Sequence, residues 1–360
     1  MVSPKQNKLA VWAVTPNGVK LTDRLADSLP DVDIYVSQNL AEKKTSHILF
    51  ERLSATLEEK FGQYTGHIFI MATGIVVRVL APLIQSKSMD PAVVVVDDLG
   101  KNAISLLSGH IGGANELTQK IARIIEANPV ITTATDINEV PAIDVLAMER
   151  GLVIENPEAI KTVNMAFLKR EEVLLHDPFN FLANDLLNSE SGICKRLMYD
   201  INYSSQQTEI KNSSCVYIDD VLSELPSKVL ILRPPTLVAG IGCNRGTDSE
   251  EISTHLKEVL ESQRLAPTSL KCLASIDIKS DEAGLIAVAE SLDMPLIFFT
   301  SEELNQAKGI KNPSPVVEKH VGVKSVCEAA AIKASGDGTL IVPKESTKNV
   351  TVAIARIDFS

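Results

Sequence analysis

Two short apolar runs, Val93-Val-Val-Val96 and Val130-Ile-Thr-Thr133, flank a segment with helical periodicity. That segment extends from Gly113 to Ala127, and its apolar side chains recur at i, i+4, i+7 and i+8 (Leu117, Ile121, Ile124 and Ile125). The spacing predicts a helix with one buried stripe, which Asn128-Pro129 ends. A strand, a helix and a second strand in succession indicate a parallel sheet with helical crossovers.

Similar apolar runs extend this pattern in both directions along the chain. Three earlier runs read as strands: Leu9–Val14, Val32–Val36 and His67–Met71. They predict that residues 1–138 form an α/β domain with a doubly wound parallel sheet. Five later runs predict a second α/β domain at 236–360: Leu237–Ile241, Leu270–Ile276, Pro295–Phe299, Leu340–Val342 and Val350–Ile354. Three capping boxes are expected to open its helices: Thr247-x-x-Glu250, Thr300-x-x-Glu303 and Ser325-x-x-Glu328.

The region between these two domains has a weaker pattern. Residues 188–214 are rich in Ser, Asn and Gln and show no sustained period, so we expect a small irregular middle domain at 139–235. Its end, Arg233-Pro-Pro-Thr236, reads as a linker because consecutive prolines favour extended backbone.

Composition and charge exclude several classes of protein. The 360 residues carry 35 basic and 46 acidic side chains, a net charge of −11, and only 4% aromatics. No basic run is longer than two residues, which argues against binding to nucleic acid or to an anionic membrane. Neither a signal peptide nor an apolar stretch of about 20 residues is recognisable, so we expect a cytoplasmic protein. The scattered cysteines and histidines predict neither disulfides nor a metal site.

The densest chemical signal is the loop Ser108-Gly-His-Ile-Gly-Gly-Ala-Asn-Glu116, just before the predicted helix. Glycines allow a ligand to approach the backbone, and a helix start favours a negative group, so an anion site is one interpretation. Tight packing of strand against helix explains Gly112 and Gly113 equally well. The glycine spacing matches neither the dinucleotide fingerprint nor a P-loop. His110 and Glu116 are candidates for acid–base work, although His110 could instead bond the backbone and Glu116 could simply favour the helix dipole.

Two further groups of residues follow predicted strands. Thr73-Gly74 opens a helix that carries Arg78, while Asp97-Asp98 and Thr135-Asp136 end later strands. We expect all of them at the carboxyl edge of the sheet, where crevices form in such folds. Solvent exposure of Arg78 and helix capping by the aspartates are the competing interpretations.

A second glycine loop, Gly240-Ile-Gly-Cys-Asn-Arg-Gly-Thr247, lies in the C-terminal part. Acidic residues crowd the following helical turn and would repel an anion, an effect that Arg245 could offset. Cys243 lacks the flanking glycines of a nucleophile elbow, so we interpret it as a small buried side chain, and Ser108 fails the same test.

Taken together, these segments resemble the cobalt-precorrin-5A hydrolase family of cobalamin biosynthesis. The resemblance rests on residues 71–78, 90–97, 104–117 and 130–136, and on the C-terminal segments 240–247, 275–282 and 321–331. It is specific over 66–138 and 238–356 and poor over 141–235. Asn244 stands where a second basic residue would be expected beside Arg245.

The resemblance implies a reaction and a substrate. The family opens the δ-lactone of cobalt-precorrin-5A with water and releases acetaldehyde, giving cobalt-precorrin-5B. His110 or Glu116 would activate water, with an oxyanion held by backbone N–H groups near Gly112 and Gly113. Several anion sites would hold the carboxylates of the macrocycle, at positions on three loops and the elements beside them: Thr73, Gly74, Arg78, Ser108, Gly109, Gly112, Gly113, Asn115, Asp136, Gly242, Arg245 and Lys279.

The same resemblance sets expectations for cofactors and partners. The substrate itself carries the cobalt, so no cofactor and no metal held by the protein are expected. A homodimer or contacts with other enzymes of the pathway remain open. The alternative from another class is a noncatalytic carrier or scaffold for corrinoid intermediates. A dinucleotide-binding oxidoreductase is a weaker alternative, because the glycine fingerprint is missing.

Overall fold

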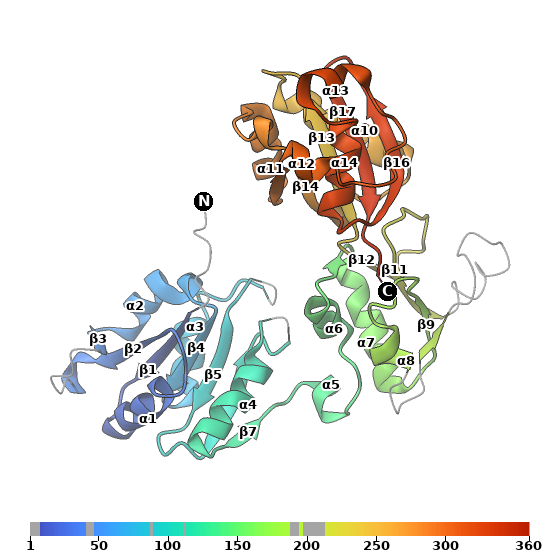
Figure 1. Ribbon diagram of the computed structural model, residues 1–360. Helices are drawn as coiled ribbons and strands as arrows, with labels where there is room; N and C mark the ends of the chain where they lie inside the picture. The colour runs from blue at the N-terminus through green and yellow to red at the C-terminus, as the bar shows by residue number, and fades with distance from the viewer. Residues whose placement is uncertain are drawn as a thin grey trace. The chain divides into compact units, whose positions relative to one another are not determined.

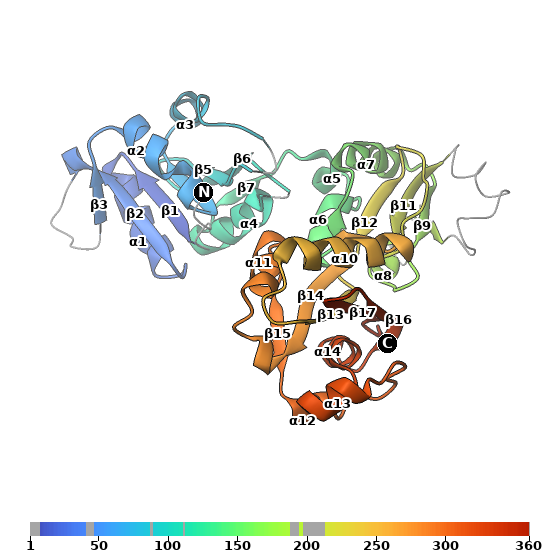
Figure 2. The ribbon, with the colours of Figure 1, turned by 90° about the horizontal axis from the view of Figure 1, so that it is seen from above.

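The computed structural model describes residues 8–40, 47–86, 89–110, 112–187, 194–196 and 213–359. The chain divides into two compact units, residues 1–145 and 146–360 (Figures 1 and 2). We describe each unit by itself. The three-domain boundaries at 138 and 235 stay a prediction. Among the described residues no helix is both long and apolar enough to cross a bilayer.

The first unit is built on a seven-stranded sheet of order β3-β2-β1-β4-β5-β6-β7. Its strands are β1 (Leu9–Ala13), β2 (Val32–Ser37), β3 (His47–Phe50), β4 (Gly66–Ile70), β5 (Ala92–Val96), β6 (Asn102–Leu107) and β7 (Asn128–Val130). Its helices are α1 (Pro16–Ala26), α2 (Leu53–Lys60), α3 (Thr73–Leu80), α4 (Ala114–Ile125) and α5 (Ala134–Ile137), and α6 (Ile143–Glu149) crosses the boundary between the units.

Helices cover both faces of this sheet, as the sequence predicts. Side chains of α1 and α4, such as Leu25 and Ile121, pack with Ile68 on one face. Leu57 of α2 and Leu80 of α3 belong to the cluster on the other face. The doubly wound α/β architecture is therefore confirmed, because each amphipathic helix buries its apolar stripe against one face.

One strand departs from the predicted parallel arrangement. β6 pairs antiparallel to β5, with Leu107 opposite Val93 and Ala103 opposite Val96, and β7 runs parallel to β6. The sequence pattern misses β6 because the strand is mostly half-buried, so it lacks the continuous apolar run of β5. The strand expected at 130–133 is β7, which lies earlier and includes Pro129.

The C-terminal part of the second unit has a five-stranded sheet of order β15-β14-β13-β17-β16. Its strands are β13 (Leu237–Cys243), β14 (Leu270–Ile276), β15 (Leu296–Phe299), β16 (Thr339–Ser346) and β17 (Val350–Arg356). Its helices are α10 (Ser249–Ser262), α11 (Ala283–Ser291), α12 (Ser301–Leu304), α13 (Pro315–Val321) and α14 (Val326–Ala334). The α10 and α11 side chains pack on one face, and α12 and α14 contribute to a separate cluster with Val238 and Ala274.

The middle region is more regular than its sequence indicates. It contains a sheet of order β10-β9-β11-β12-β8, made of β8 (Val153–Ile154), β9 (Val173–His176), β10 (Cys194–Arg196), β11 (Ser214–Ile218) and β12 (Leu230–Arg233), with helices α7 (Ile160–Lys169) and α8 (Ala183–Leu187). Strands of two to five residues are too short to show a clear period. The aperiodic stretch that we singled out, 188–214, lies mostly outside the described residues.

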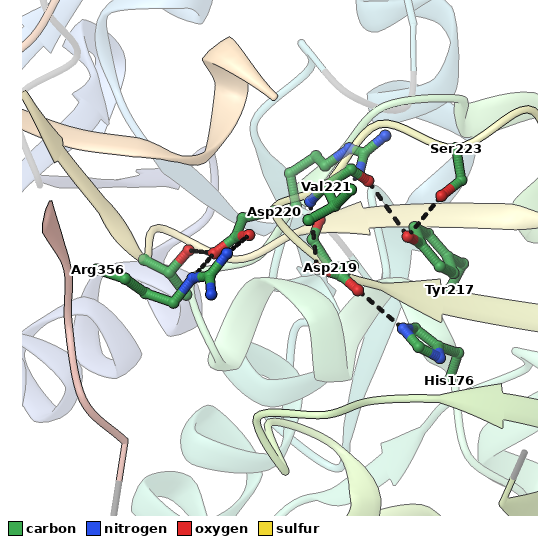
Figure 3. Close-up of polar contacts among 9 residues, drawn as sticks. His176, Tyr217, Asp219, Asp220, Val221, Ser223 and Arg356 are labelled. Carbon is green, nitrogen blue, oxygen red and sulfur yellow. Dashed lines mark hydrogen bonds and ion pairs between the residues drawn. The ribbon is translucent and has the colours of Figure 1, made fainter. Parts of the chain in front are cut away.

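The predicted linker is buried and held by hydrogen bonds. Arg233 ends β12, and its Nη1 donates to the carbonyl oxygens of Asp219 and Val221, both at 2.9 Å. Asp220 is fully buried and accepts from Thr236 Oγ1 at 2.6 Å. Its carboxylate also receives Arg356 Nε at 2.7 Å and Nη2 at 2.6 Å (Figure 3). The middle sheet and the C-terminal sheet are thus joined by a bidentate ion pair whose carboxylate is fully buried and whose arginine side chain is partly exposed.

Of the three expected capping boxes, one forms. Thr300 and Glu303 exchange both hydrogen bonds. The helix α10 is capped by Asp248 in place of Thr247, and Ser325 makes no side-chain cap bond to α14. Glu328, the expected partner of Ser325, turns instead to the backbone N–H groups of Lys311, Asn312 and Lys344. A buried carboxylate needs hydrogen-bond donors, and it accepts from the N–H groups that the tertiary structure places beside it.

Gly240 determines how closely α14 packs on β13. A Cβ atom at this position would lie 1.9 Å from the carbonyl oxygen of Cys327. We expect Gly240→Ala to lower the free energy of unfolding by about 1–3 kcal/mol, because backbone must shift to admit the methyl group. Gly62→Ala is the control, since a Cβ there meets no heavy atom within 4 Å. Chemical denaturation measures both, and equal stability of the two variants would contradict this packing.

Candidate active site

The glycine loop that the sequence singled out connects β6 to α4 and is tightly wound. Ser108 has a φ of 58°, in the left-handed region that few non-glycine residues adopt. A Cβ on Gly112 would lie 2.3 Å from the Cβ of Ser108. Glycine at 112 is therefore required by close approach within the loop. Strain of this kind is typical of functional sites.

Several N–H groups of this loop are used internally. Gly113 donates to the carbonyl oxygen of His110 at 2.8 Å, Ala114 to that of Ser108 at 3.1 Å, and Asn115 to that of Gly109 at 3.0 Å. In this conformation, the N–H of Gly113 is not available to an oxyanion. The hydroxyl of Ser108 is buried and has no hydrogen-bond partner in the described part of the chain.

His110 has a carboxylate beside each of its ring nitrogens. Its Nε2 lies 2.9 Å from Asp136 Oδ2, and its Nδ1 lies 3.6 Å from Asp144 Oδ2. Thr135 Oγ1 also lies 3.0 Å from Nε2. The imidazole side chain is 17% exposed and that of Asp144 only 6%, whereas Asp136 is 35% exposed. This arrangement favours the doubly protonated imidazolium.

Asn115 holds this cluster in position from the first turn of α4. Its Nδ2 donates to Asp136 Oδ2 at 3.1 Å and to Thr133 Oγ1 at 3.0 Å. Its Oδ1 accepts from Ser105 Oγ at 2.6 Å. Because Asn115 is buried and uses both ends of its amide, it fixes the orientation of the Asp136 carboxylate.

The carboxylates shift the acid–base behaviour of His110. The hydrogen bond to Asp144 raises the pKa of His110, burial opposes that rise, and Asp136 adds to it. A raised pKa in the folded state stabilises the protein below the ordinary histidine pKa of about 6.5, and this contribution is lost as the pH rises through the raised value.

We expect the imidazole C–H resonances of His110 to titrate above pH about 6.5 in an NMR titration. In Asp144→Asn the midpoint should move down, because the neutral amide no longer stabilises the imidazolium. A His110 midpoint that does not change on this substitution would contradict the proposed pairing.

Glu116 does not join this cluster. It is exposed in the first turn of α4, and no contact with His110 occurs among the described residues. The sequence instead underrated Asp136, which we expected only to bind substrate, and missed Thr135 and Asp144 as partners of His110. No sequence motif near Asp144 predicts its contact with His110, because the two side chains are brought together only by the course of the chain after β7.

Thr73, Gly74 and Arg78 lie at the opposite edge of the sheet, which corrects our expectation of one shared edge. Thr73 and Gly74 follow the carboxyl end of β4, parallel to β5, whereas the His110 loop follows β6, which runs the other way. Val93 and Val96, which lie at the two ends of the paired part of β5, are three residues apart, so the two edges are separated by about 10 Å. Arg78 Nη1 donates to the carbonyl of Gly74 at 2.9 Å and is exposed.

The C-terminal candidates lie together in the second unit. Arg245 pairs with Asp281, and its Nη2 donates to the carbonyl of Ile278 at 2.9 Å. Lys279 Nζ lies 3.3 Å from Glu282 Oε2. Gly242 and Lys279 both line a pocket of about 310 Å³, whose other lining residues do not include Arg245. Burial raises the pKa of the Cys243 thiol, which agrees with a packing role.

No group of three or more His, Cys, Asp or Glu side chains in the described ranges is arranged to hold a metal ion. The His110 cluster consists of a cation with a carboxylate on each side, one of the two carboxylates partly open to solvent.

Family models match three consecutive parts of the chain. Residues 55–136 match the model described as Cobalamin synthesis G N-terminal, residues 141–234 match Cobalamin biosynthesis central region, and residues 237–355 match Cobalamin synthesis G C-terminus. The central match covers the region where the sequence resemblance was poor.

Curated relatives match over nearly the full length. Cobalt-precorrin-5A hydrolase of Salmonella typhimurium is 39% identical over 98% of this chain and 99% of its own. Cobalt-precorrin-5A hydrolase of Priestia megaterium is 34% identical over 97% of this chain and 95% of its own. Among solved structures, cobalamin biosynthesis protein chiG from Agrobacterium tumefaciens is 34% identical over 33% of this chain and 96% of its own, with a TM-score of 0.27.

Proposed function

Because the chain belongs to the cobalt-precorrin-5A hydrolase family of cobalamin biosynthesis, we propose that it opens the δ-lactone of cobalt-precorrin-5A with water and releases acetaldehyde, giving cobalt-precorrin-5B. The observation that carries this proposal is the placement of His110 between Asp136 and Asp144. A proton donor and a proton acceptor at one site can serve the two proton transfers of a hydrolysis, to the leaving oxygen and from the attacking water.

The geometry assigns different roles to the members of the cluster. Both ring nitrogens of His110 face carboxylates, so the imidazolium is better suited to give a proton than to take one from water. Asp136 is the more exposed carboxylate, and its Oδ2 is occupied by His110 and Asn115. We assign the removal of the proton of the attacking water to Asp136 and the protonation of the lactone alkoxide to His110.

Asp144 and Asn115 act on the reaction through these two residues. Asp144 is nearly buried and keeps His110 charged, while Asn115 orients Asp136. Both are positioning residues. Glu116 stays a weaker candidate for water activation, because it is exposed and does not lie next to the proton donor His110.

The oxyanion of the lactone carbonyl needs a donor close to the attacking water. Since the N–H of Gly113 is turned to His110 and the Ser108 hydroxyl is buried from solvent, we assign this role to the N–H of Gly112.

The second step breaks a carbon–carbon bond. The alcohol freed from the lactone gives its O–H proton to His110, which the first step left neutral, and becomes the carbonyl of acetaldehyde. The electron pair of the broken bond passes into the conjugated macrocycle. The substrate thereby serves as its own electron sink, and the cobalt travels with it. This is why we propose no resident cofactor for the protein.

One anaerobic assay tests the proposal and separates it from the carrier alternative. Purified protein is incubated with the cobalt-containing lactone substrate, and acetaldehyde is measured against protein concentration. Several turnovers per chain are expected. Stoichiometric binding of the substrate without acetaldehyde would favour a carrier.

Thr73, Gly74 and Arg78 lie at the other edge of the sheet, so we leave them out of the proposed reaction site.

A further inference from the structure

The C-terminal sheet carries a pocket of about 310 Å³ that the reaction site does not use. It lies where β13 ends, beside the start of α14 and the turn between β16 and β17. Three lysines line it, Lys279, Lys344 and Lys348, and its lining includes no Asp or Glu. In a chain with a net charge of −11, this is a local concentration of positive charge.

The start of α14 adds uncapped backbone donors to this pocket. Ser325, Val326 and Cys327 line it, and Ser325 makes no side-chain cap bond. Glu328, the acidic residue of the first helical turn, is engaged with N–H groups outside α14. The positive end of a nine-residue helix is thus left without its usual capping oxygen at a pocket lined by lysines.

Part of the lining is apolar. Ile276, Ile278, Val326 and Val350 contribute to it, and Ile278 is 50% exposed. Hydroxyl and amide side chains also line the pocket. A ligand that satisfies both parts has an apolar body and carboxylates on its rim.

We propose that this lysine pocket binds carboxylates at the rim of a polycarboxylate tetrapyrrole, and that it does so without the His110 cluster. The ligand class rests on the proposed function, whereas the binding rests on the charge, the helix start and the apolar lining. Lys344 and Lys348 are the contacts to test. Lys279 already pairs with the Glu282 carboxylate, whereas Lys344 Nζ donates to an uncharged group, the carbonyl oxygen of Asn312, at 3.3 Å.

The probe is uroporphyrin III, a stable octacarboxylate tetrapyrrole, titrated against the full-length protein by calorimetry. We expect the Lys344→Gln/Lys348→Gln double variant to bind it at least about tenfold more weakly, since two charge-assisted contacts are lost. Lys257→Gln, an exposed lysine of α10 outside the pocket, is the charge control and should bind as the unaltered protein does. Cobalamin, whose acid side chains are mostly amides, should bind poorly.

Two results would contradict binding at the lysine pocket. One is an unchanged affinity of the double variant for uroporphyrin III. The other is an equal loss of affinity in Lys257→Gln, which would indicate unspecific charge attraction. His110→Ala separates this inference from the proposed function. It should bind uroporphyrin III normally and fail to release acetaldehyde from the lactone substrate. If His110→Ala keeps full turnover while the double variant loses binding, the pocket stands and the reaction assignment fails. Loss of uroporphyrin III binding in folded His110→Ala would contradict an independent pocket.

Discussion

His110→Ala is expected to lower acetaldehyde release at saturating substrate by about 10²- to 10⁴-fold, the usual contribution of a positioned acid–base group. The variant removes the proton donor and also leaves Asp136 and Asp144 without the cation between them. Asp136→Asn should reduce the rate by a similar factor, because the amide cannot accept the proton of the attacking water. Anaerobic single-time-point and progress-curve assays of acetaldehyde measure both.

The other members of the cluster should give graded results. Asp144→Asn is expected to cost less than His110→Ala and to move the pH dependence of kcat downward, because it lowers the pKa of His110 without removing the imidazole. Glu116→Gln should have the smallest effect of the set. If Glu116→Gln is the inactive variant and His110→Ala retains near-full turnover, the roles proposed for the cluster are wrong.

Arg356→Ala is expected to lower the free energy of unfolding of the second unit by about 3 kcal/mol. This is the lower end of the cost of removing one partner of a buried ion pair, because Asp220 is fully buried but the Arg356 side chain is 29% exposed. Asp220 is fully buried, and in the variant its carboxylate keeps the Thr236 hydroxyl but loses both guanidinium bonds. The Arg356 guanidinium also lies 5.7 Å above the Phe179 ring, and this contact is lost as well.

The single tryptophan makes this effect assignable to one unit. Trp12 is buried in the first unit, so its fluorescence follows that unit, whereas far-UV circular dichroism follows both. In Arg356→Ala the dichroism signal should begin to fall at lower denaturant than the fluorescence does. Lys169→Ala, which breaks the exposed pair with Glu171, is the control and should cost less than about 1 kcal/mol.

A second variant shows whether the loss comes from the unpaired charge. Replacing both partners, Asp220→Leu with Arg356→Met, should be less destabilising than Arg356→Ala alone, since no buried charge is left without a partner. If the double variant is the less stable of the two, the pair itself contributes net stability and the explanation by an unpaired carboxylate is wrong.

The predictions that succeeded rest on local patterns. The stripe of Leu117 and Ile121 predicts α4, because the helical period of 3.6 is set by the backbone itself. The continuous β-branched run Val93–Val96 predicts β5, because such a run suits a strand that is buried on both faces. The glycine loop was placed correctly before α4, although β6, the strand that leads into it, was not predicted. The middle sheet escaped prediction because its strands are too short for a period to show.

The failures have one physical origin. β6 is a half-buried strand whose direction depends on its pairing with β5, and that direction moved the His110 loop to the edge opposite Thr73 and Gly74. Asp144 reaches His110 across 34 residues of chain. Glu116 looked like the nearer partner because it is close in sequence, yet the helix directs it to solvent.

The sequence alone determined the layered α/β architecture, the position of the glycine loop and the family to which the chain belongs, because these depend on periodicity and on motifs of neighbouring residues. Only the tertiary structure decided which edge of the sheet carries the loop and which carboxylates flank His110. It also decided that the predicted linker at Arg233–Thr236 is buried next to an ion pair. Strand direction and long-range contacts follow from the packing of the whole unit, which no local pattern encodes.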